Sequence, residues 1–394
     1  MLLKPMVRNN ICLNAHPLGC AKETERQIAY VRDRVGAYRK LSGPKAVLVL
    51  GCSTGYGLAS RITAAFGFGA ATVGVSFERP PSDASTATPG WYDNRAFDEA
   101  ALGAGIPVAS FDGDAFSKDM KARVVQAARE LGIRFDLVVY SLASPVRKDP
   151  ETGEQYRSVI KPIGGVYRGM NVDVFTKALS FAEVQPATED EIEQTVKVMG
   201  GEDWELWIEA LGGAGVLAPK AKTVAYSYIG PELSWAIYRD GTIGKAKNHL
   251  EASAKRIRAF GAAGSGIEAY VSINKALVTR ASSVIPVIPL YVSVLFKVMK
   301  ERGLHEDCSA QMDRLFRERL YLNGKVPVDA EGRIRIDELE MGASVQAEVS
   351  GRIARINSEN LGELADVEGF RSDFLRIHGF EVEGVDYEAE VASR

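Results

Sequence analysis

Cysteine is scarce in this chain, which has only four in 394 residues: Cys12, Cys20, Cys52 and Cys308. Because no two of them form a CxxC pair, they do not make a disulfide framework, and they fit a reducing cytoplasm. Cys12, His16 and Cys20 have the spacing of metal ligands on a helix. Since Pro17 and Gly19 prevent a continuous helix and no fourth ligand is near, we predict no metal site.

Long apolar runs are absent as well. The most apolar stretch, residues 284–296, contains two prolines and is shorter than the about 20 residues that a transmembrane helix needs. We interpret it as a core helix that also walls an acyl pocket. The N-terminal segment carries Lys4 and Arg8 and has no apolar core before a small-residue cleavage site, so no signal peptide is expected. The expectation is a soluble, cytoplasmic protein without membrane insertion.

An excess of one charge is also missing. The chain has 48 Lys and Arg residues against 51 Asp and Glu residues, which gives a net charge of −3. Nothing therefore draws the whole molecule to nucleic acid or to anionic lipid. The content of 46% hydrophobic and 25% charged residues is that of an ordinary globular protein, which excludes a disordered or fibrous chain.

What the sequence does contain is an alternation of short apolar runs with helical stretches. Apolar runs at 45–50, 71–78 and 106–111 are each followed by a segment with apolar residues at helical spacing, and a fourth run begins at Phe135. Strands that alternate with helices predict a parallel sheet with right-handed crossovers. We therefore expect an α/β fold, with one enlarged Rossmann domain over residues 1–394 and helices flanking its sheet.

The alternation stops after Ser144, and residues 145–221 form an insertion rich in Pro, Gly and short β-like pieces. We expect a hairpin between Tyr156 and Val184 and a helix from Glu189 to Leu211, and we predict that the insertion forms a partial lid near the active site. The remaining expected elements are a strand in TVAYSYIG, a helix at 245–260, a strand at 269–278, a helix at 290–302, and a helical C-terminal extension with a β-like segment at 333–337.

A glycine-rich turn joins the first predicted strand to its helix, in the pattern Gly51-x3-Gly55-x-Gly57. A pyrophosphate needs free N–H groups at a helix N-terminus and no Cβ in the way, which such glycines provide. The lysine that the P-loop of nucleotide hydrolases requires does not follow. Because strand, turn and helix fall in the expected order, we predict a dinucleotide site rather than a simple tight turn.

Glu78 ends the second predicted strand. A carboxylate there accepts hydrogen bonds from the adenosine ribose and repels a 2′-phosphate, so it favours NADH over NADPH, although the neighbouring Arg79 opposes this preference. By position alone, the adenine is expected beside Asp114 and Ala115, and the second half of the cofactor beside Leu142 and Ala143.

Tyr238 and Lys247, in the stretch YRDGTIGKAK, are a candidate catalytic pair. On a continuous helix they would point about 180° apart, because each residue turns about 100°. Gly241 and Gly244 predict a break, after which the two side chains can converge. A phenol with a pKa of about 10 becomes a usable acid when an ammonium stabilises its phenolate. From these residues alone, a core phenol and a surface lysine remain the simpler interpretation.

The chain closely resembles the family of trans-2-enoyl-CoA reductases and FabV-type enoyl-acyl-carrier-protein reductases, in the motifs GCSTGYGLASRITAAFG, TPGWYDNRAF, VYSLASPVR, KVMGGEDWE, YSYIGPE and YRDGTIGKAK. The resemblance extends from Lys4 to the end of the sequence. It implies an NADH-dependent, monomeric, enlarged relative of the short-chain dehydrogenases. Such an enzyme reduces the trans-2 double bond of enoyl thioesters, such as crotonyl-CoA, in fatty acid biosynthesis.

The resemblance also implies roles for matching residues. Tyr238 resembles the proton donor, Lys247 the cofactor-binding lysine and Tyr228 a contact of the substrate thioester. The implied NADH site consists of Gly51, Cys52, Ser53, Thr54, Gly55, Tyr56, Phe77, Glu78, Asp114, Ala115, Leu142, Ala143, Lys247, Leu277, Val278 and Thr279.

Two other functions stay open. A carbonyl reductase of the short-chain dehydrogenase kind would use the same tyrosine on an alkoxide, and an NADH sensor would bind the cofactor without turnover, which an intact Tyr–Lys pair argues against. The carrier is open too, because CoA and an acyl carrier protein both favour cations near the pocket mouth. The YSYIGPE stretch resembles the CoA-type members more closely, which favours CoA.

Overall fold

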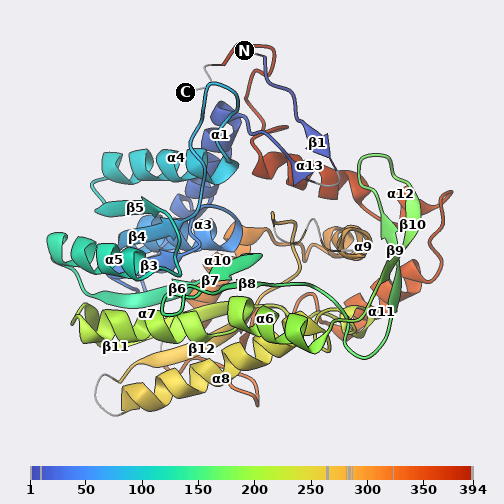
Figure 1. The fold of residues 1–394 in the computed structure, drawn as a ribbon. Coiled ribbons are helices and arrows are strands. Elements are labelled where there is room, and N and C mark those ends of the chain that lie inside the picture. The colour runs from blue at the N-terminus through green and yellow to red at the C-terminus, as the bar shows by residue number, and fades with distance from the viewer. Residues whose placement is uncertain are drawn as a thin grey trace.

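The computed structural model describes residues 2–8, 11–262, 266–280, 282, 285, 287–322 and 324–391. Its centre is a seven-stranded parallel sheet with the strand order β13-β12-β11-β6-β3-β4-β5 (Figure 1). The predicted α/β class with a Rossmann-type sheet is confirmed. The strands are β3 (Ala46–Leu50), β4 (Ala71–Ser76), β5 (Val108–Asp112), β6 (Phe135–Tyr140), β11 (Leu217–Ser227), β12 (Glu268–Ile273) and β13 (Arg333–Arg335).

Helices cover both faces of the sheet. In β3, Leu48 packs into a core that includes Trp204 and Trp207, whereas Val47 packs into another that includes Met312. This alternation follows from the two-residue period of a strand, and it buries both faces of β3. Figure 1 shows α7 and α8 on one side of the sheet and α1 and α4 on the other.

The helices that match predictions are α4 (Pro89–Gly103), α5 (Lys118–Glu130), α8 (Thr242–Ala262) and α9 (Ile288–Glu301). Residues 284 and 286 of the predicted apolar stretch lie outside the described residues. Within the described part of the chain, no helix combines the length and apolar content that crossing a membrane requires. Helix α3 (Gly55–Ile62) is the helix predicted after the glycine turn, and the predicted helical C-terminal extension contains α10 (Cys308–Leu315), α11 (Ala343–Ile353), α12 (Leu361–Leu364) and α13 (Val367–Ile377). Helices α1 (Pro17–Arg32) and α2 (Val35–Tyr38) were not predicted.

The insertion contains the predicted hairpin, formed by β9 (Tyr167–Val172) and β10 (Leu179–Val184), and β9 packs beside α9 (Figure 1). A second hairpin, β7 (Val146–Lys148) with β8 (Gln155–Arg157), was not expected. A third small antiparallel pair, β1 (Val7–Arg8) with β2 (Ile11–Cys12), lies near the N-terminus. Whether the insertion acts as a lid stays a prediction.

The single helix predicted from Glu189 to Leu211 is wrong. The structure has α6 (Glu189–Met199) and α7 (Glu202–Gly213), separated by Gly200 and Gly201. A Cβ on Gly201 would lie 2.2 Å from Ser253 Oγ on α8, so the break lets the chain approach α8 closely. The strand predicted to run to Val278 is also too long, because β12 ends at Ile273 and an irregular segment follows.

Candidate functional site

The predicted site residues follow the carboxyl ends of adjacent parallel strands. Parallel strands place those ends at one edge of a sheet, and a doubly wound sheet binds ligands where its strand order reverses. Here the reversal lies between β3 and β6. Gly51 follows β3, and a Cβ added to it would lie 2.3 Å from Ser141 O, just after β6. The glycine turn therefore lies at the reversal of the strand order, where a doubly wound sheet is expected to bind its ligand.

The glycines of the turn are required by its geometry. Gly51 and Gly55 have φ of +83° and +57°, values that other L-residues rarely adopt. A Cβ on Gly57 would lie 1.8 Å from the carbonyl oxygen of Gly51. Helix α3 begins at Gly55 and its N-cap residue, Thr54, makes no side-chain cap hydrogen bond. Its first backbone N–H groups thus lack a side-chain cap, as a pyrophosphate site requires.

The side chains within the turn differ in what they face. The thiol of Cys52 is buried and lies 3.6 Å from Asn94 Oδ1, so only the backbone of Cys52 can face a dinucleotide. Tyr56 donates a hydrogen bond of 2.6 Å to the carbonyl oxygen of Lys275, with Gln311 Oε1 at 3.2 Å. The turn is therefore tied to the segment that follows β12.

Glu78 lies beside the glycine turn, as the sequence predicts. Its Oε1 accepts a 2.7 Å hydrogen bond from Ser53 Oγ, and its side chain is 4% exposed. The cation that pairs with it is Arg280, at 2.8 and 3.1 Å. Arg79, which the sequence singled out as the competing cation, instead bonds through its backbone to Thr88.

The other predicted cofactor residues line the same edge. Phe77 is 82% exposed although it follows a buried strand, which suits a ring that a flat base covers. Leu142 and Thr279 both approach the glycine turn, with Leu142 Cδ2 3.4 Å from a Cβ built on Gly51 and Thr279 Cγ2 3.7 Å from one built on Gly55. Asp114 caps a local turn through Phe116 N, Ala143 is exposed, and Ala115, Leu277 and Val278 are buried.

Tyr238 lies in the turn before α8 and Lys247 in the second turn of that helix. The predicted break is at Gly241, because α8 begins at Thr242, while Gly244 lies inside the first turn. The rings of Tyr238 and Tyr228 pack edge to face, with centroids 5.0 Å apart. The structure thus brings the predicted proton donor and the predicted thioester contact together.

The electrostatics of the pair differ from the expected phenolate. Lys247 Nζ donates a 3.4 Å hydrogen bond to the carbonyl oxygen of Tyr226, and burial lowers the pKa of Lys247 to about 8. Burial, helped by the negative charge of Glu340, raises the pKa of Tyr238. Tyr238 is therefore a neutral hydroxyl, the form that can donate a proton. Stabilisation of its phenolate by Lys247 stays a prediction.

Sequence reasoning missed several residues that support the site. Glu340, from the turn before α11, accepts hydrogen bonds from Tyr228 and Tyr291. Gln311 of α10 holds Tyr56 and also accepts from Lys275 N. No local motif marks these positions. Each lies in the C-terminal extension, which the sequence predicts only to be helical and charged.

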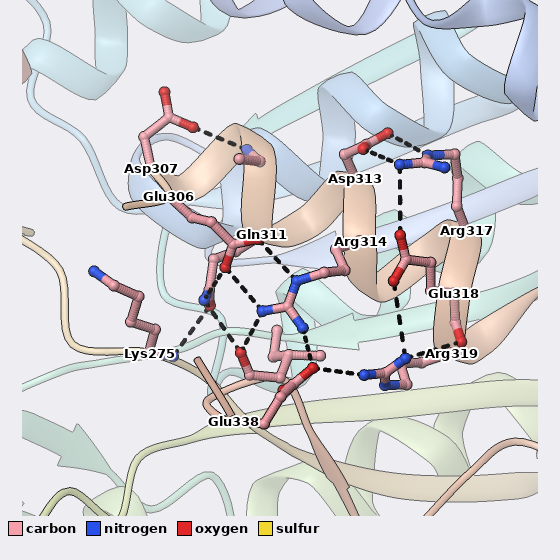
Figure 2. Close-up of polar contacts among 12 residues, drawn as sticks. Lys275, Glu306, Asp307, Gln311, Asp313, Arg314, Arg317, Glu318, Arg319 and Glu338 are labelled. Carbon is pink, nitrogen blue, oxygen red and sulfur yellow. Dashed lines mark hydrogen bonds and ion pairs between the residues drawn. The ribbon is translucent and has the colours of Figure 1, made fainter. Parts of the chain in front are cut away.

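An ion network anchors α10 beside the site. Figure 2 shows Arg314 between Glu306 and Glu338, with Arg319 also reaching Glu338. Gln311 Nε2 donates to Glu306 at 3.1 Å, which extends the network to the residue that holds Tyr56.

Comparisons with known proteins cover nearly the whole chain. Residues 85–321 match the trans-2-enoyl-CoA reductase catalytic region, residues 2–83 match the NAD(P)H binding domain of trans-2-enoyl-CoA reductase, and residues 328–391 match a model described as an enoyl reductase FAD binding domain.

Two curated relatives align end to end. The trans-2-enoyl-CoA reductase [NADH] of Treponema denticola is 57% identical over 99% of this chain and 98% of its own. The enoyl-[acyl-carrier-protein] reductase [NADH] of Flavobacterium johnsoniae is 52% identical over 99% and 97%.

Two solved structures share the fold. The trans-2-enoyl-CoA reductase of Treponema denticola in complex with NAD has a TM-score of 0.96 at 56% identity and covers 99% of this chain and 98% of its own. The trans-2-enoyl-CoA reductase of Clostridium acetobutulicum in complex with NADH also has a TM-score of 0.96, at 43% identity, covering 100% and 98%.

The two implied cofactors fit this structure differently. The glycine turn fits an NADH molecule, and so does the N-terminus of α3, where no side chain caps the backbone N–H groups. The buried side chain of Glu78 fits it as well. The described residues of 328–391 do not form such a cradle, because β13 is followed by Ile336 and a buried Asp337 that pairs with Arg335. The loop from Ile336 to Gly342 separates β13 from α11, so these two elements are not joined by the tight glycine turn that a flavin pyrophosphate would need, and no step below involves a flavin.

Proposed function

The chain belongs to the family of NADH-dependent trans-2-enoyl-CoA and enoyl-[acyl-carrier-protein] reductases, and we propose that it performs this reaction with Tyr238 as its proton donor. The reaction is the reduction of the trans-2 double bond of an enoyl thioester to the saturated acyl thioester. NADH, when bound, supplies the hydride that adds to the β-carbon. The observation that carries the residue assignment is the contact of Tyr238 with Tyr228 beside α8.

The role of Tyr238 is to stabilise the thioester oxygen, on which negative charge develops. Addition of hydride at the β-carbon places negative charge on the thioester oxygen, and a preorganised donor aimed at that oxygen stabilises the transition state. Among the described residues, the Tyr238 hydroxyl has no hydrogen-bond partner, so its proton is available to the substrate. Because the side chain is only 8% exposed, competing water is limited.

Lys247 and Glu78 would hold the two ends of the cofactor. Lys247 lies on α8, where its ammonium would bond the nicotinamide ribose, and its only described hydrogen bond, to Tyr226, is long and easily exchanged. At the other end, Glu78 would accept from the adenosine ribose while Phe77 covers the adenine. Tyr228 would contact the thioester next to Tyr238.

We propose CoA as the preferred carrier and a monomer in the cytoplasm as the working form. The YSYIGPE stretch supports CoA by its resemblance to CoA-type members. Relatives named as enoyl-CoA reductases and relatives named as enoyl-[acyl-carrier-protein] reductases are both more than half identical to this chain. Overall sequence identity therefore does not separate the two carriers.

Turnover separates the candidate functions. We expect loss of NADH absorbance with crotonyl-CoA, slower loss with the crotonyl thioester of an acyl carrier protein, and none with a simple ketone. Faster turnover of the carrier-protein substrate would reverse the carrier proposal. Ketone reduction without enoyl reduction would favour a carbonyl reductase, and NADH binding without any turnover would favour a sensor.

Glu78→Gln is expected to weaken NADH binding by about 10-fold, because a neutral amide replaces a charged acceptor. It should also strengthen NADPH binding, since the repulsion of a 2′-phosphate is lost and Arg280 loses its carboxylate partner. Both dissociation constants can be measured by fluorescence titration. The matched control is Glu99→Gln, on the exposed face of α4. An unchanged ratio of the two constants in Glu78→Gln would remove Glu78 from cofactor selection.

A further inference from the structure

Glu340 is a fully buried carboxylate, 0% exposed, at the point where three separate segments meet. Its Oε1 accepts hydrogen bonds from Tyr228 Oη at 2.9 Å and from Tyr291 Oη at 2.7 Å. Its Oε2 accepts from the backbone N–H of Ala276 at 2.6 Å. These donors come from the end of β11, from α9 and from the segment after β12. A buried carboxylate with this set of donors is held in one place.

These bonds decide where the proton of Tyr228 goes. A phenol has a single O–H, so a tyrosine that donates to one acceptor can only accept from any other partner. Tyr228 donates to Glu340 and therefore has no proton left for the thioester oxygen. Tyr291 is committed in the same way, and it accepts from Gln346 Nε2 at 3.2 Å.

Tyr238 is the phenol that remains. Its ring packs against the Tyr228 ring at 82°, so fixing Tyr228 also fixes one wall of the Tyr238 site. Burial, together with the negative charge of Glu340, raises the pKa of both phenols, which keeps Tyr238 in its donor form. Burial raises the pKa of Glu340, while the charge of Lys275, whose ammonium lies over the ring of Phe296, and the hydrogen bonds that Glu340 accepts oppose that rise.

We propose that Glu340 is a positioning residue of the reductase site, which accepts the hydrogen bond of the Tyr228 hydroxyl, fixes the Tyr228 ring against Tyr238 and leaves Tyr238 as the phenol that donates to the thioester oxygen. This inference rests on the proposed function. In this arrangement Tyr228 packs along one side of the Tyr238 site. Its hydroxyl can still accept a hydrogen bond, but it does not donate a second one to the thioester oxygen. It also gives the C-terminal extension a place in the active site.

The test is a double-mutant cycle between Glu340→Gln and Tyr228→Phe, with kcat and the KM for NADH measured separately. Glu340→Gln is expected to lower kcat by about 10- to 100-fold, the effect of a misplaced reacting group. The KM for NADH should change much less than kcat, because the glycine turn, Glu78 and Lys247 are untouched, although Glu340 also holds Ala276 N beside the predicted cofactor residue Leu277. The double variant should lose no more than the more impaired single variant, since both changes remove the hydrogen bond between the Tyr228 hydroxyl and a charged carboxylate at position 340.

The matched control is Glu363→Gln, the same substitution on α12 of the C-terminal extension. The Glu363 side chain is exposed and, in the part of the chain that the structure describes, takes no part in the contacts of the tyrosines. We expect its kcat to equal that of the unmodified chain. A kcat that falls in Glu340→Gln and not in Glu363→Gln supports the positioning role.

Two results would overturn the proposal: full kcat in Glu340→Gln, or effects of Glu340→Gln and Tyr228→Phe that multiply in the double variant. If Glu340→Gln fails to fold, Glu340→Asp replaces it in the same cycle. This carboxylate is one methylene shorter, so a partial loss of kcat with the same non-additivity is expected. Failure of the proposed function is distinguishable, because the unmodified chain would then not reduce crotonyl-CoA at all.

Discussion

Replacing Tyr238 with phenylalanine is expected to lower kcat by about 10²- to 10³-fold, the usual effect of removing one donor from a developing oxyanion. The substitution deletes only the hydroxyl, and the ring can keep its edge-to-face contact with Tyr228. NADH affinity should change little, because the glycine turn and Glu78 are untouched. Steady-state kinetics with crotonyl-CoA and fluorescence titration with NADH measure the two quantities.

The matched control is Tyr270→Phe. Tyr270 is on β12 and its hydroxyl donates to Glu268, so its loss should leave turnover unchanged. If Tyr238→Phe turned over at the rate of the unmodified chain, Tyr238 would not be the proton donor. Tyr228 could not then replace it while its own hydroxyl donates a hydrogen bond to Glu340.

Gly57→Ala is expected to disrupt the dinucleotide site. The new Cβ would lie 1.8 Å from the carbonyl oxygen of Gly51 and 2.8 Å from its carbonyl carbon. Both atoms belong to the backbone, so no side-chain rotation can relieve the overlap and the turn itself must move. Overpacking of this kind costs about 1–3 kcal/mol. If that strain falls on the bound form, NADH affinity drops by about 5- to 150-fold.

Gly103→Ala tests whether the effect depends on position. Gly103 ends α4, and a Cβ there would meet nothing within 4 Å. An alanine should be neutral or stabilise the protein by about 0.4–1 kcal/mol, because it restricts the unfolded chain. Melting temperatures and NADH dissociation constants are measured for both variants. Normal NADH binding in Gly57→Ala would mean that the turn does not approach the cofactor closely.

The sequence predicts those parts of the site whose signals are local. The strand, the glycines and α3 follow one another directly. A glycine at position 51 indicates a positive φ, and the structure has one there. The separation of Tyr238 from α8 was also predictable, because Gly241 precedes the first residue of that helix. Each inference needs only a short window of sequence.

The remaining features depend on contacts between distant segments. The Gly200–Gly201 pair is a local signal for the break between α6 and α7, but the close approach of Gly201 to Ser253 of α8, which leaves no room for a side chain there, is not visible in the sequence. Arg280 reaches Glu78 from beyond β12, whereas the sequence pointed to the adjacent Arg79. Glu340 meets Tyr228 only after the C-terminal extension has packed against the sheet. Tertiary packing, rather than local pattern, selects these partners.

The edge strand β13 sets a constraint on how the chain can be made. It pairs with β12 through Val271–Arg333, Ser272–Ile334 and Ile273–Arg335, across a long stretch of intervening sequence. During synthesis, the outer edge of β12 stays unpaired until residues 333–335 leave the ribosome, and contacts so distant in sequence form slowly. An open strand edge is a template for aggregation. We therefore expect nascent chains that stall before β13 to depend on chaperones and to lack Glu340, which holds Tyr228 and Tyr291.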